Sequence, residues 1–188
     1  GFYGTGNQNL PYQGIVLDGN EIIPGRRSDI EQRLSMIPSH VLVEKNILDI
    51  ASNLGMSSLT AYSMGAKCCQ GLEISSHMVD LASRFAAFSG AYPGVKFKQY
   101  NVDTDRLTCT EKYDTAFIFS IIAHIKRPDR LVEIVRNHVK KYVVFEGHPS
   151  GKLEDYEDFF SACEFIQVEE IGRLNTSKFS DDRKRILW

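Results

Sequence analysis

From residue 46 onward, short apolar runs alternate with stretches of helical periodicity, and this alternation constrains the fold more than any other feature of the chain. In the clearest helical stretch, 76–89, Leu81, Phe85 and Phe88 share one face. The predicted strands are 46–50, 67–73, 95–100, 113–119, 142–146, 165–171 and 183–188. The predicted helices are 56–64, 76–89, 128–137 and 153–163.

The predicted sheet is mostly parallel, because a helix lies between most pairs of successive strands. Between the last two predicted strands lies only a loop, 172–182, so these two strands should pair antiparallel. We therefore predict an α/β fold, a three-layer αβα sandwich around a seven-stranded, mostly parallel sheet. At 188 residues, the chain suits one such domain.

The composition argues against several classes of protein. The formal net charge of −2 gives no whole-molecule attraction to nucleic acid or to anionic lipid. No apolar run approaches the roughly 20 residues of a membrane helix, and the first residues lack the basic start and apolar stretch of a signal peptide. We expect a cytoplasmic protein with no membrane partner. The local basic clusters in 126–130 and 183–185 are interpreted as solvated surfaces.

The most informative segment runs from a predicted strand into Asp49 and then through small residues to Gly55. In open α/β sheets, ligands bind beyond the carboxyl ends of the strands. Small residues let a ligand approach the backbone, and the start of the next helix offers unpaired N–H groups. Taken alone, the segment is equally typical of an ordinary turn after a strand.

Two further acidic residues follow the next predicted strands. Glu73 ends the second strand, 18 residues after Gly55, where a nucleoside-binding domain keeps a carboxylate for the ribose hydroxyls. Asp103 follows the third strand, where it can accept a hydrogen bond from an adenine amine while Val102 packs on the ring. Each could instead be a surface, turn or capping residue. Together, acids at three consecutive strand ends indicate one nucleoside site.

These residues resemble the motifs of class I S-adenosylmethionine-dependent methyltransferases over 46–188. Segment 49–55 is similar to the family's Asp-x-Gly-x-Gly-x-Gly motif, 73–78 to its acidic-x-Ser-x-x-Met motif, 101–103 to its adenine-contacting turn and 113–120 to its fourth strand. The resemblance implies a Rossmann-like sheet with strand order 3-2-1-4-5-7-6 and strand 7 antiparallel. It implies S-adenosyl-L-methionine as cofactor. The implied cofactor-binding residues are Asp49, Ala51, Ser52, Asn53, Gly55, Glu73, Ile74, Met78, Val102, Asp103 and Ser120.

The first motif departs from the family pattern at two positions, because Ala51 and Asn53 stand where the family has glycine. Alanine is the smallest change available and asparagine tolerates left-handed backbone, so we expect cofactor binding to survive. The sequence argues against a nicotinamide cofactor. The Gly-x-Gly-x-x-Gly pattern is absent, and Asp49 would place a like charge near a pyrophosphate.

Residues 1–45 are expected to form a lead-in or lid segment before the binding domain of 46–188, as in many relatives where such a segment folds over the cofactor. A turn at 24–25 precedes a helix capped by Ser28 or Asp29. Three arginines in this segment could clamp a carboxylate or phosphate of the substrate. Alternatively, they form helix-surface salt bridges with acidic neighbours. The three arginines are Arg26, Arg27 and Arg33.

The catalytic candidates are His124, just past the fourth strand, and Glu146 and His148, which end the fifth. A hydroxyl acceptor needs its proton removed, and a histidine near neutral pKa is the usual base. The resemblance places His124 at the border of the acceptor pocket. Together, Glu146 and His148 with His124 could provide a pair of general bases, and a metal site is the weaker alternative. A structural or capping role also stays open for His124.

The sequence therefore predicts an enzyme, a methyltransferase acting on an oxygen or nitrogen of a small-molecule acceptor. A nucleic-acid acceptor is not favoured, although an RNA-modifying enzyme remains an alternative. The Arg-rich lead-in bears a weaker likeness to methyltransferase-like enzymes of tRNA wobble-uridine modification. A third alternative is a non-catalytic module that binds S-adenosylmethionine, since two motif glycines are replaced. The sequence predicts neither the acceptor's identity nor the oligomeric state.

Overall fold

A computed structural model describes residues 12–17, 20–25, 27, 29–108, 110, 112–147, 152–165, 167–175 and 184–187. The lead-in contains β1 (Ile15–Leu17), β2 (Asn20–Ile23), α1 (Ile30–Ser35) and α2 (Ser39–Leu42). The central part contains β3 (Asn46–Ile50), α3 (Met56–Ser63), β4 (Cys68–Glu73), α4 (Ser76–Phe88), β5 (Val95–Gln99) and β6 (Tyr113–Phe119). The last part contains η1 (Ile122–His124), α5 (Pro128–His138), β7 (Val139–Glu146), η2 (Leu153–Tyr156), α6 (Glu157–Ala162), β8 (Gly172–Asn175) and β9 (Lys184–Leu187).

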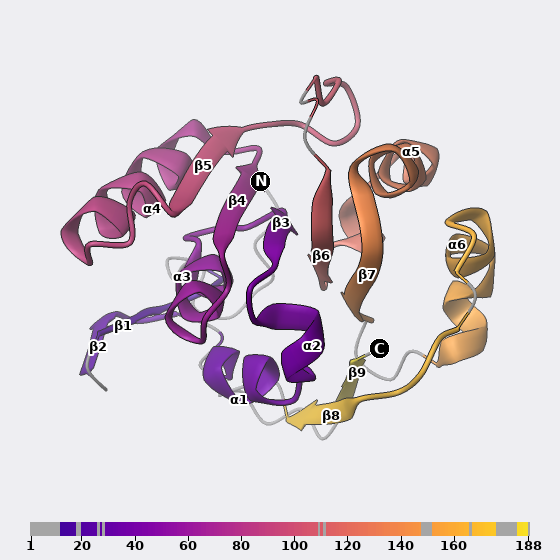
Figure 1. The fold of residues 1–188 in the computed structure, drawn as a ribbon, viewed down its shortest axis with the longest axis horizontal. Helices are drawn as coiled ribbons and strands as arrows, with labels where there is room; N and C mark the ends of the chain where they lie inside the picture. The colour runs from indigo at the N-terminus through magenta and orange to yellow at the C-terminus, as the bar shows by residue number, and fades with distance from the viewer. Residues whose placement is uncertain are drawn as a thin grey trace, which may run out of the picture.

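Five parallel strands form the centre of the sheet, in the order β5-β4-β3-β6-β7. The predicted α/β class with a parallel sheet is confirmed. Antiparallel β9 and β8 extend this sheet beyond β7. Within the described residues, β9 meets β7 only where Leu187 faces Glu146. In Figure 1, α3 and α4 lie beside β4 and β5, and α5 and α6 lie beyond β7 on the other side.

Both faces of the sheet are buried, because neighbouring residues of each central strand enter different apolar clusters. Leu48, Ala116 and Phe145 pack with α5 and α6 on one face. Ile47 and Phe117 pack on the other face, where the cluster also includes residues from α1, α2, α3 and α4. The sheet is therefore the middle layer of three, and its strands read as nearly continuous apolar runs.

Most predicted elements form within a few residues of their expected bounds, but the prediction of the sixth strand at 165–171 was wrong. None of the described residues of 165–171 is in a strand, and β8 begins only at Gly172. The apolar residues of this segment do pack on the core, Val168 against the cluster with α5 and α6 and Ile171 against the cluster on the other face, so the apolar pattern that predicted a strand belongs to a loop lying on the core. β7 also begins earlier than predicted, directly at the end of α5.

The lead-in is packed into the core of the sheet domain. Leu34, Ile37 and Leu42 are buried in the same cluster as residues of β3 and β6. The helix predicted after Asp29 forms as α1, although the Asp29 side chain makes no capping hydrogen bond. β2 and α2 were not predicted, since four-residue elements carry too little periodicity to be detected.

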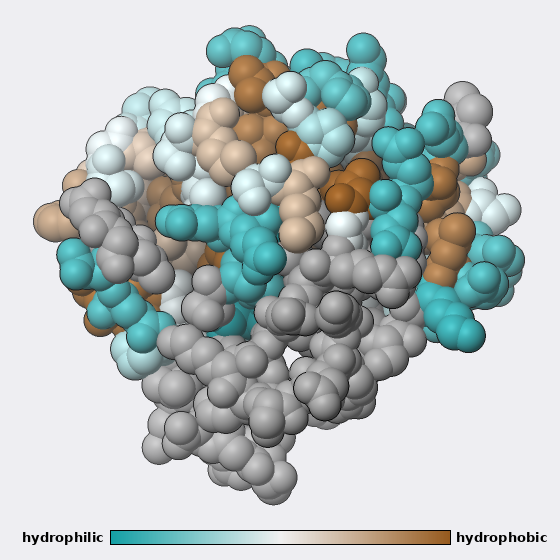
Figure 2. Space-filling view, turned by 90° about the horizontal axis from the view of Figure 1, so that it is seen from below, coloured by the Kyte–Doolittle hydropathy of each residue, from teal (hydrophilic) through white to brown (hydrophobic). Residues whose placement is uncertain are grey.

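Apolar residues on the surface are scattered. On the face shown in Figure 2, they form small areas among hydrophilic residues. The exposed large side chains in the described part of the chain include Phe88, which is 82% exposed, and Ile74, which is 60% exposed. Scattered apolar residues are ordinary on a folded domain. None of the described helices combines the length and apolar character needed to cross a membrane.

Candidate functional site

The turn after β3 has left-handed backbone at each of the three motif positions. The φ angles are 62° at Ala51, 53° at Asn53 and 77° at Gly55. Two backbone hydrogen bonds hold the turn, from Ser52 N to Leu72 O at 2.9 Å and from Gly55 N to Ser52 O at 2.8 Å. Since a Cβ disfavours positive φ, this geometry explains why glycine suits these positions. The chain keeps the turn shape although two of the glycines are replaced.

Gly55 is needed for space as well as for its φ angle. A Cβ on Gly55 would lie 2.2 Å from the ring of Phe97, and one on Gly71 would lie 2.3 Å from the same ring. The ring of this β5 residue therefore packs directly against both glycines. Sequence reasoning missed Phe97, because nothing in its own segment indicates that its ring reaches the turn.

Asp49, near the end of β3, is buried beside the turn. Its side chain is 2% exposed and accepts a hydrogen bond of 2.7 Å from the hydroxyl of Ser58 in α3. Burial raises the pKa of Asp49 to about 6, and the Ser58 hydrogen bond and the charge of Arg33 only partly offset this. Asp49 thus ties the strand to the helix that follows the turn.

Glu73 connects β4 to the same turn. Its two carboxylate oxygens accept hydrogen bonds of 2.9 Å from the backbone N–H groups of Asn53 and Ser75. A carboxylate has about four lone-pair sites, so acceptor capacity remains for a ligand hydroxyl. Ile74 follows with its side chain exposed, and Met78 packs in a small cluster with Leu54 of the turn.

Asp103 lies at the same edge of the sheet, in the loop after β5. Its Oδ1 accepts hydrogen bonds from the backbone N–H groups of Lys126 at 3.0 Å and Arg127 at 2.9 Å, just before α5. One oxygen of Asp103 is thus used to join this loop to the segment after β6. Val102 packs against the core cluster that includes α5. The structure therefore brings the acidic ends of β3, β4 and β5 to one edge.

The lead-in contacts the turn through Gln13, which is 5% exposed. Its backbone N–H donates to Asn53 Oδ1, and its side-chain Oε1 accepts from the N–H of Met56, each over 3.3 Å. The sequence predicts N–H groups at the start of α3 that are open to a ligand, and the N–H of Met56 is instead paired with Gln13. Sequence reasoning missed Gln13, since a lone glutamine in a loop carries no signal.

At the ends of β6 and β7, buried charged groups form a network. Arg27 donates to both carboxylate oxygens of Asp29, over 2.8 and 2.5 Å, and to both oxygens of Glu146, over 2.9 and 3.2 Å. It also donates to the hydroxyl of Tyr12 over 2.8 Å. Ser120, which has a left-handed φ of 57°, forms a short hydrogen bond with Glu146.

This network fixes the ionisation of Glu146. Burial alone would raise the pKa of Glu146, but the positive charges of Arg33 and Arg27 and the hydrogen bonds to it lower the pKa to about 2. Glu146 is 0% exposed and remains a carboxylate near neutral pH. In this arrangement it anchors arginines and does not resemble a group that takes up a proton at pH 7.

The three predicted arginines have different surroundings. Arg27 pairs with Asp29, as the ion-pair alternative expected, but the pair is buried with Glu146 and does not lie on a helix surface. Arg33 is 1% exposed, with its guanidinium 4.5 Å from the centre of the Phe119 ring and one nitrogen 3.4 Å from Glu146. Arg26 lies outside the described residues.

His124 ends the short helix η1 directly after β6, and its side chain is exposed. His148 lies outside the described residues, so its distance from His124 is not defined. Within the residues that the structure describes, no three His, Cys, Asp or Glu side chains come together as a metal site.

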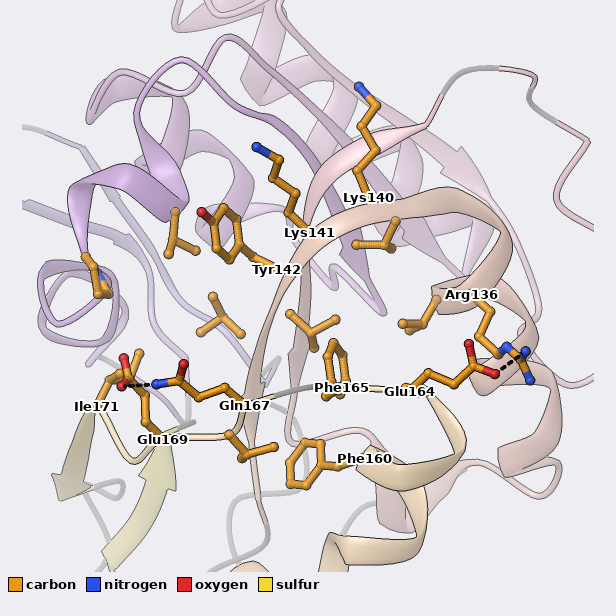
Figure 3. A pocket seen from close by; sticks show the side chains of 18 of the residues that line it. Arg136, Lys140, Lys141, Tyr142, Phe160, Glu164, Phe165, Gln167, Glu169 and Ile171 are labelled. Carbon is orange, nitrogen blue, oxygen red and sulfur yellow. Dashed lines mark hydrogen bonds and ion pairs between the residues drawn. The ribbon is translucent and has the colours of Figure 1, made fainter.

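A cavity of about 680 Å³ lies away from these strand ends, along β7 and the segment that follows α6 (Figure 3). Lys140, Lys141 and Tyr142 line one side of it, and Phe160 and Phe165 line another. None of the predicted site residues lines this cavity. Its volume is thus not evidence for the site at the strand ends.

No family model matches the chain, and no curated protein matches it. Solved structures do match. Magnesium protoporphyrin IX methyltransferase from Synechocystis, with bound S-adenosylmethionine, aligns with a TM-score of 0.66 at 18% identity, over 84% of this chain and 76% of that one. A putative RNA methyltransferase from Pyrococcus horikoshii aligns with a TM-score of 0.61 at 13% identity, over 85% and 76%.

A third match is an S-adenosylmethionine-dependent methyltransferase from Mesorhizobium loti, with a TM-score of 0.54 at 20% identity. This match covers 64% of the chain, which spans only 54% of the Mesorhizobium protein. At such low identities the likeness concerns the fold and not the activity. The chain therefore has the Rossmann-like fold found in S-adenosylmethionine-dependent methyltransferases.

Proposed function

We propose that this chain is an S-adenosylmethionine-dependent methyltransferase. One observation carries the proposal: the turn at 51–55 keeps left-handed backbone at three alternate positions and is bonded to Glu73 at the next strand end. Non-glycine residues with positive φ are uncommon and cluster at functional sites, and this turn contains two of them, Ala51 and Asn53. In this fold, a turn of that shape lets a ligand approach the backbone.

Polar groups of the turn fit a cofactor with several hydrogen-bonding atoms. The hydroxyls of Ser52 and Ser57 are buried and have no hydrogen-bond partner among the described residues. Unpaired buried hydroxyls are uncommon in native structures unless a water or ligand meets them. We assign the remaining cofactor contacts to the other predicted residues at this edge. Those residues are Asp49, Ala51, Asn53, Gly55, Glu73, Ile74, Met78, Val102, Asp103 and Ser120.

The finer architecture belongs to the same proposal. We assign β5-β4-β3-β6-β7-β9-β8 as the family order 3-2-1-4-5-7-6, in which β9 is the antiparallel seventh strand. Residues 1–45 form the lead-in, and 46–188 form the binding domain. The contacts of Gln13 support a covering role for the lead-in, because they join it to Asn53 in the turn and to Met56 at the start of α3.

When bound, the cofactor supplies an electrophilic methyl group on a sulfonium. The chain's own task is then to position the acceptor and to take its proton. We assign to His124 the role of the base that takes the acceptor's proton, with His148 as a second candidate. Glu146 instead holds Arg27 and Ser120 in place, since its low pKa makes it a poor base. His124→Ala should lower turnover roughly 100-fold and leave cofactor affinity unchanged; equal turnover would remove His124 from the mechanism.

A small-molecule acceptor fits better than RNA. Two of the basic residues beside Asp103 are already paired, Arg127 with Asp129 and Arg130 with Glu133. Paired cations offer less attraction to phosphates. The matching putative RNA methyltransferase keeps the alternative open. Binding of tRNA that weakens steeply as salt rises would favour RNA over a small molecule.

The proposal is tested by thermal unfolding with S-adenosylmethionine, S-adenosylhomocysteine and NAD. A ligand that binds the folded state raises the melting temperature, and at 100 times its Kd it adds about 2.7 kcal/mol. We expect a shift with the first two ligands and none with NAD. A shift with NAD alone, or with none of the three, contradicts the proposal. Binding with no methyl transfer to any acceptor in a screen would favour the non-catalytic module.

A further inference from the structure

Arg33 is a buried cation with unused hydrogen-bond donors. Its Nε and Nη1 have no hydrogen-bond partner among the residues that the structure describes. The nearest oppositely charged atom is Glu146 Oε1, 3.4 Å from Nη2. An arginine has five N–H donors, and a buried donor left unpaired costs free energy. Such a side chain is expected to hydrogen-bond to a polar group of a ligand.

Arg27 shows what a satisfied arginine looks like in the same network. All three of its nitrogens donate hydrogen bonds, to Asp29, Glu146 and Tyr12. Arg27 thus has a structural role in closing the network. The two arginines share Glu146, yet only Arg33 retains donors for another group.

The position of Arg33 is fixed by its helix and by the sheet. Its neighbour Leu34 is fully buried, and the Arg33 guanidinium lies over the ring of Phe119 at the end of β6. Its charge also acts on Asp49, the acid below the turn. Arg33 therefore lies between the ends of β3, β6 and β7, close to the buried Asp49 below the turn.

We propose that Arg33 binds the carboxylate of the cofactor's amino-acid part, an inference that rests on the proposed function. A guanidinium matches a carboxylate in charge and in planar donor geometry. Asp49, on which the charge of Arg33 acts, suits the neighbouring ammonium group of the same zwitterion. Both of these nitrogens are shielded from solvent in the described part of the chain, so binding requires the segment around Gln13 to shift relative to α1. The two 3.3 Å hydrogen bonds of Gln13 are contacts that such a shift would break.

The test compares two ligands that differ in the amino-acid part. S-adenosylhomocysteine carries the carboxylate, and 5′-methylthioadenosine lacks the whole amino-acid group. Calorimetry would measure both with the wild type, with Arg33→Met, which keeps an apolar chain over Phe119, and with Arg84→Met as an exposed control. We expect Arg33→Met to weaken S-adenosylhomocysteine roughly 10- to 100-fold and to leave methylthioadenosine unchanged. The control should change neither affinity.

Equal losses for both ligands, or no loss for S-adenosylhomocysteine, would overturn the role of Arg33 and leave the proposed function standing. If the wild type binds neither ligand, the proposed function itself fails. If Arg33→Met does not fold, decarboxylated S-adenosylmethionine provides the same comparison with the wild type. It should then bind at least 10-fold more weakly than S-adenosylmethionine, and equal affinities would overturn the inference.

Discussion

Asp49 and Glu146 are both buried acids of the parallel sheet, but their surroundings shift their pKa values in opposite directions. Asp49 has one hydroxyl partner, from Ser58, nine residues along the chain, and its pKa is raised to about 6. Glu146 meets two arginines from the lead-in, more than 100 residues away in sequence, and its pKa is lowered to about 2. The acid of β3 thus has its hydrogen-bond partner nearby in the sequence, whereas the acid of β7 depends on the lead-in.

Glu146→Gln should have the largest effect, because it removes the negative partner of two buried arginines. Breaking a buried ion pair from one side costs about 3–5 kcal/mol. The free energy of unfolding, measured with urea, should fall by that amount with an unchanged m-value. Glu133→Gln, which breaks a more exposed pair with Arg130, should cost less than about 1 kcal/mol. Similar losses for the two variants would contradict the importance of the network.

The pH dependence of stability should also separate the two acids. Since the pKa of Asp49 is higher in the folded state than its ordinary value of 3.8, the folded state binds this proton more readily. The Asp49 contribution to stability therefore rises as pH falls from about 7 to about 4, by about 3 kcal/mol. Asp49→Asn should lose this rise in urea titrations at several pH values. Parallel curves for the variant and the wild type would rule out the raised pKa.

Glu146 should behave in the opposite way in acid. Its pKa is lowered from the ordinary 4.5, so its contribution is fully present above about pH 4.5 and is lost as pH falls towards 2. The wild type should therefore lose stability in that range, and Glu146→Gln should lose less. An equal acid sensitivity of the two proteins would show that Glu146 is not held as a carboxylate.

Glu73→Gln tests whether the acid at the end of β4 contributes to ligand affinity. Glutamine keeps an acceptor oxygen for one backbone N–H group but loses the charge and the second acceptor. We expect S-adenosylhomocysteine to bind roughly 10-fold more weakly, measured by calorimetry. Asp80→Asn, on an exposed part of α4, serves as the control and should bind as the wild type does. An unchanged affinity in Glu73→Gln would reject the ribose assignment.

Ala51→Gly should have the smallest effect and the opposite sign. Ala51 is held at a φ of 62°, and glycine relieves this conformation at some cost in unfolded-state entropy. We expect stabilisation by about 0.5–1 kcal/mol. Ala87→Gly, at an exposed helical position of α4, should instead destabilise by a similar amount. Destabilisation by both substitutions would show that the turn does not need left-handed backbone at position 51.

The sequence by itself determined the strands and helices of the parallel sheet, because their hydrophobic periodicity is local. It also predicted a turn of small residues after β3, but not the positive φ of Ala51, because alanine disfavours that conformation. It could not place 165–171, because an apolar pattern typical of a strand also arises in a loop whose apolar side chains pack on the core.

Only the tertiary structure decided the roles of the charged residues. A glutamate at a strand end is equally suited to a base, a ligand or an ion-pair partner until its neighbours are known. Arg27 and Glu146 come together because the lead-in packs against the sheet. The two residues are 119 positions apart, and hydrophobic periodicity carries no information on such a contact. Among the described residues, the same packing leaves Arg33 Nε and Nη1 without a hydrogen-bond partner, because the carboxylate of Glu146 is mainly bound by Arg27.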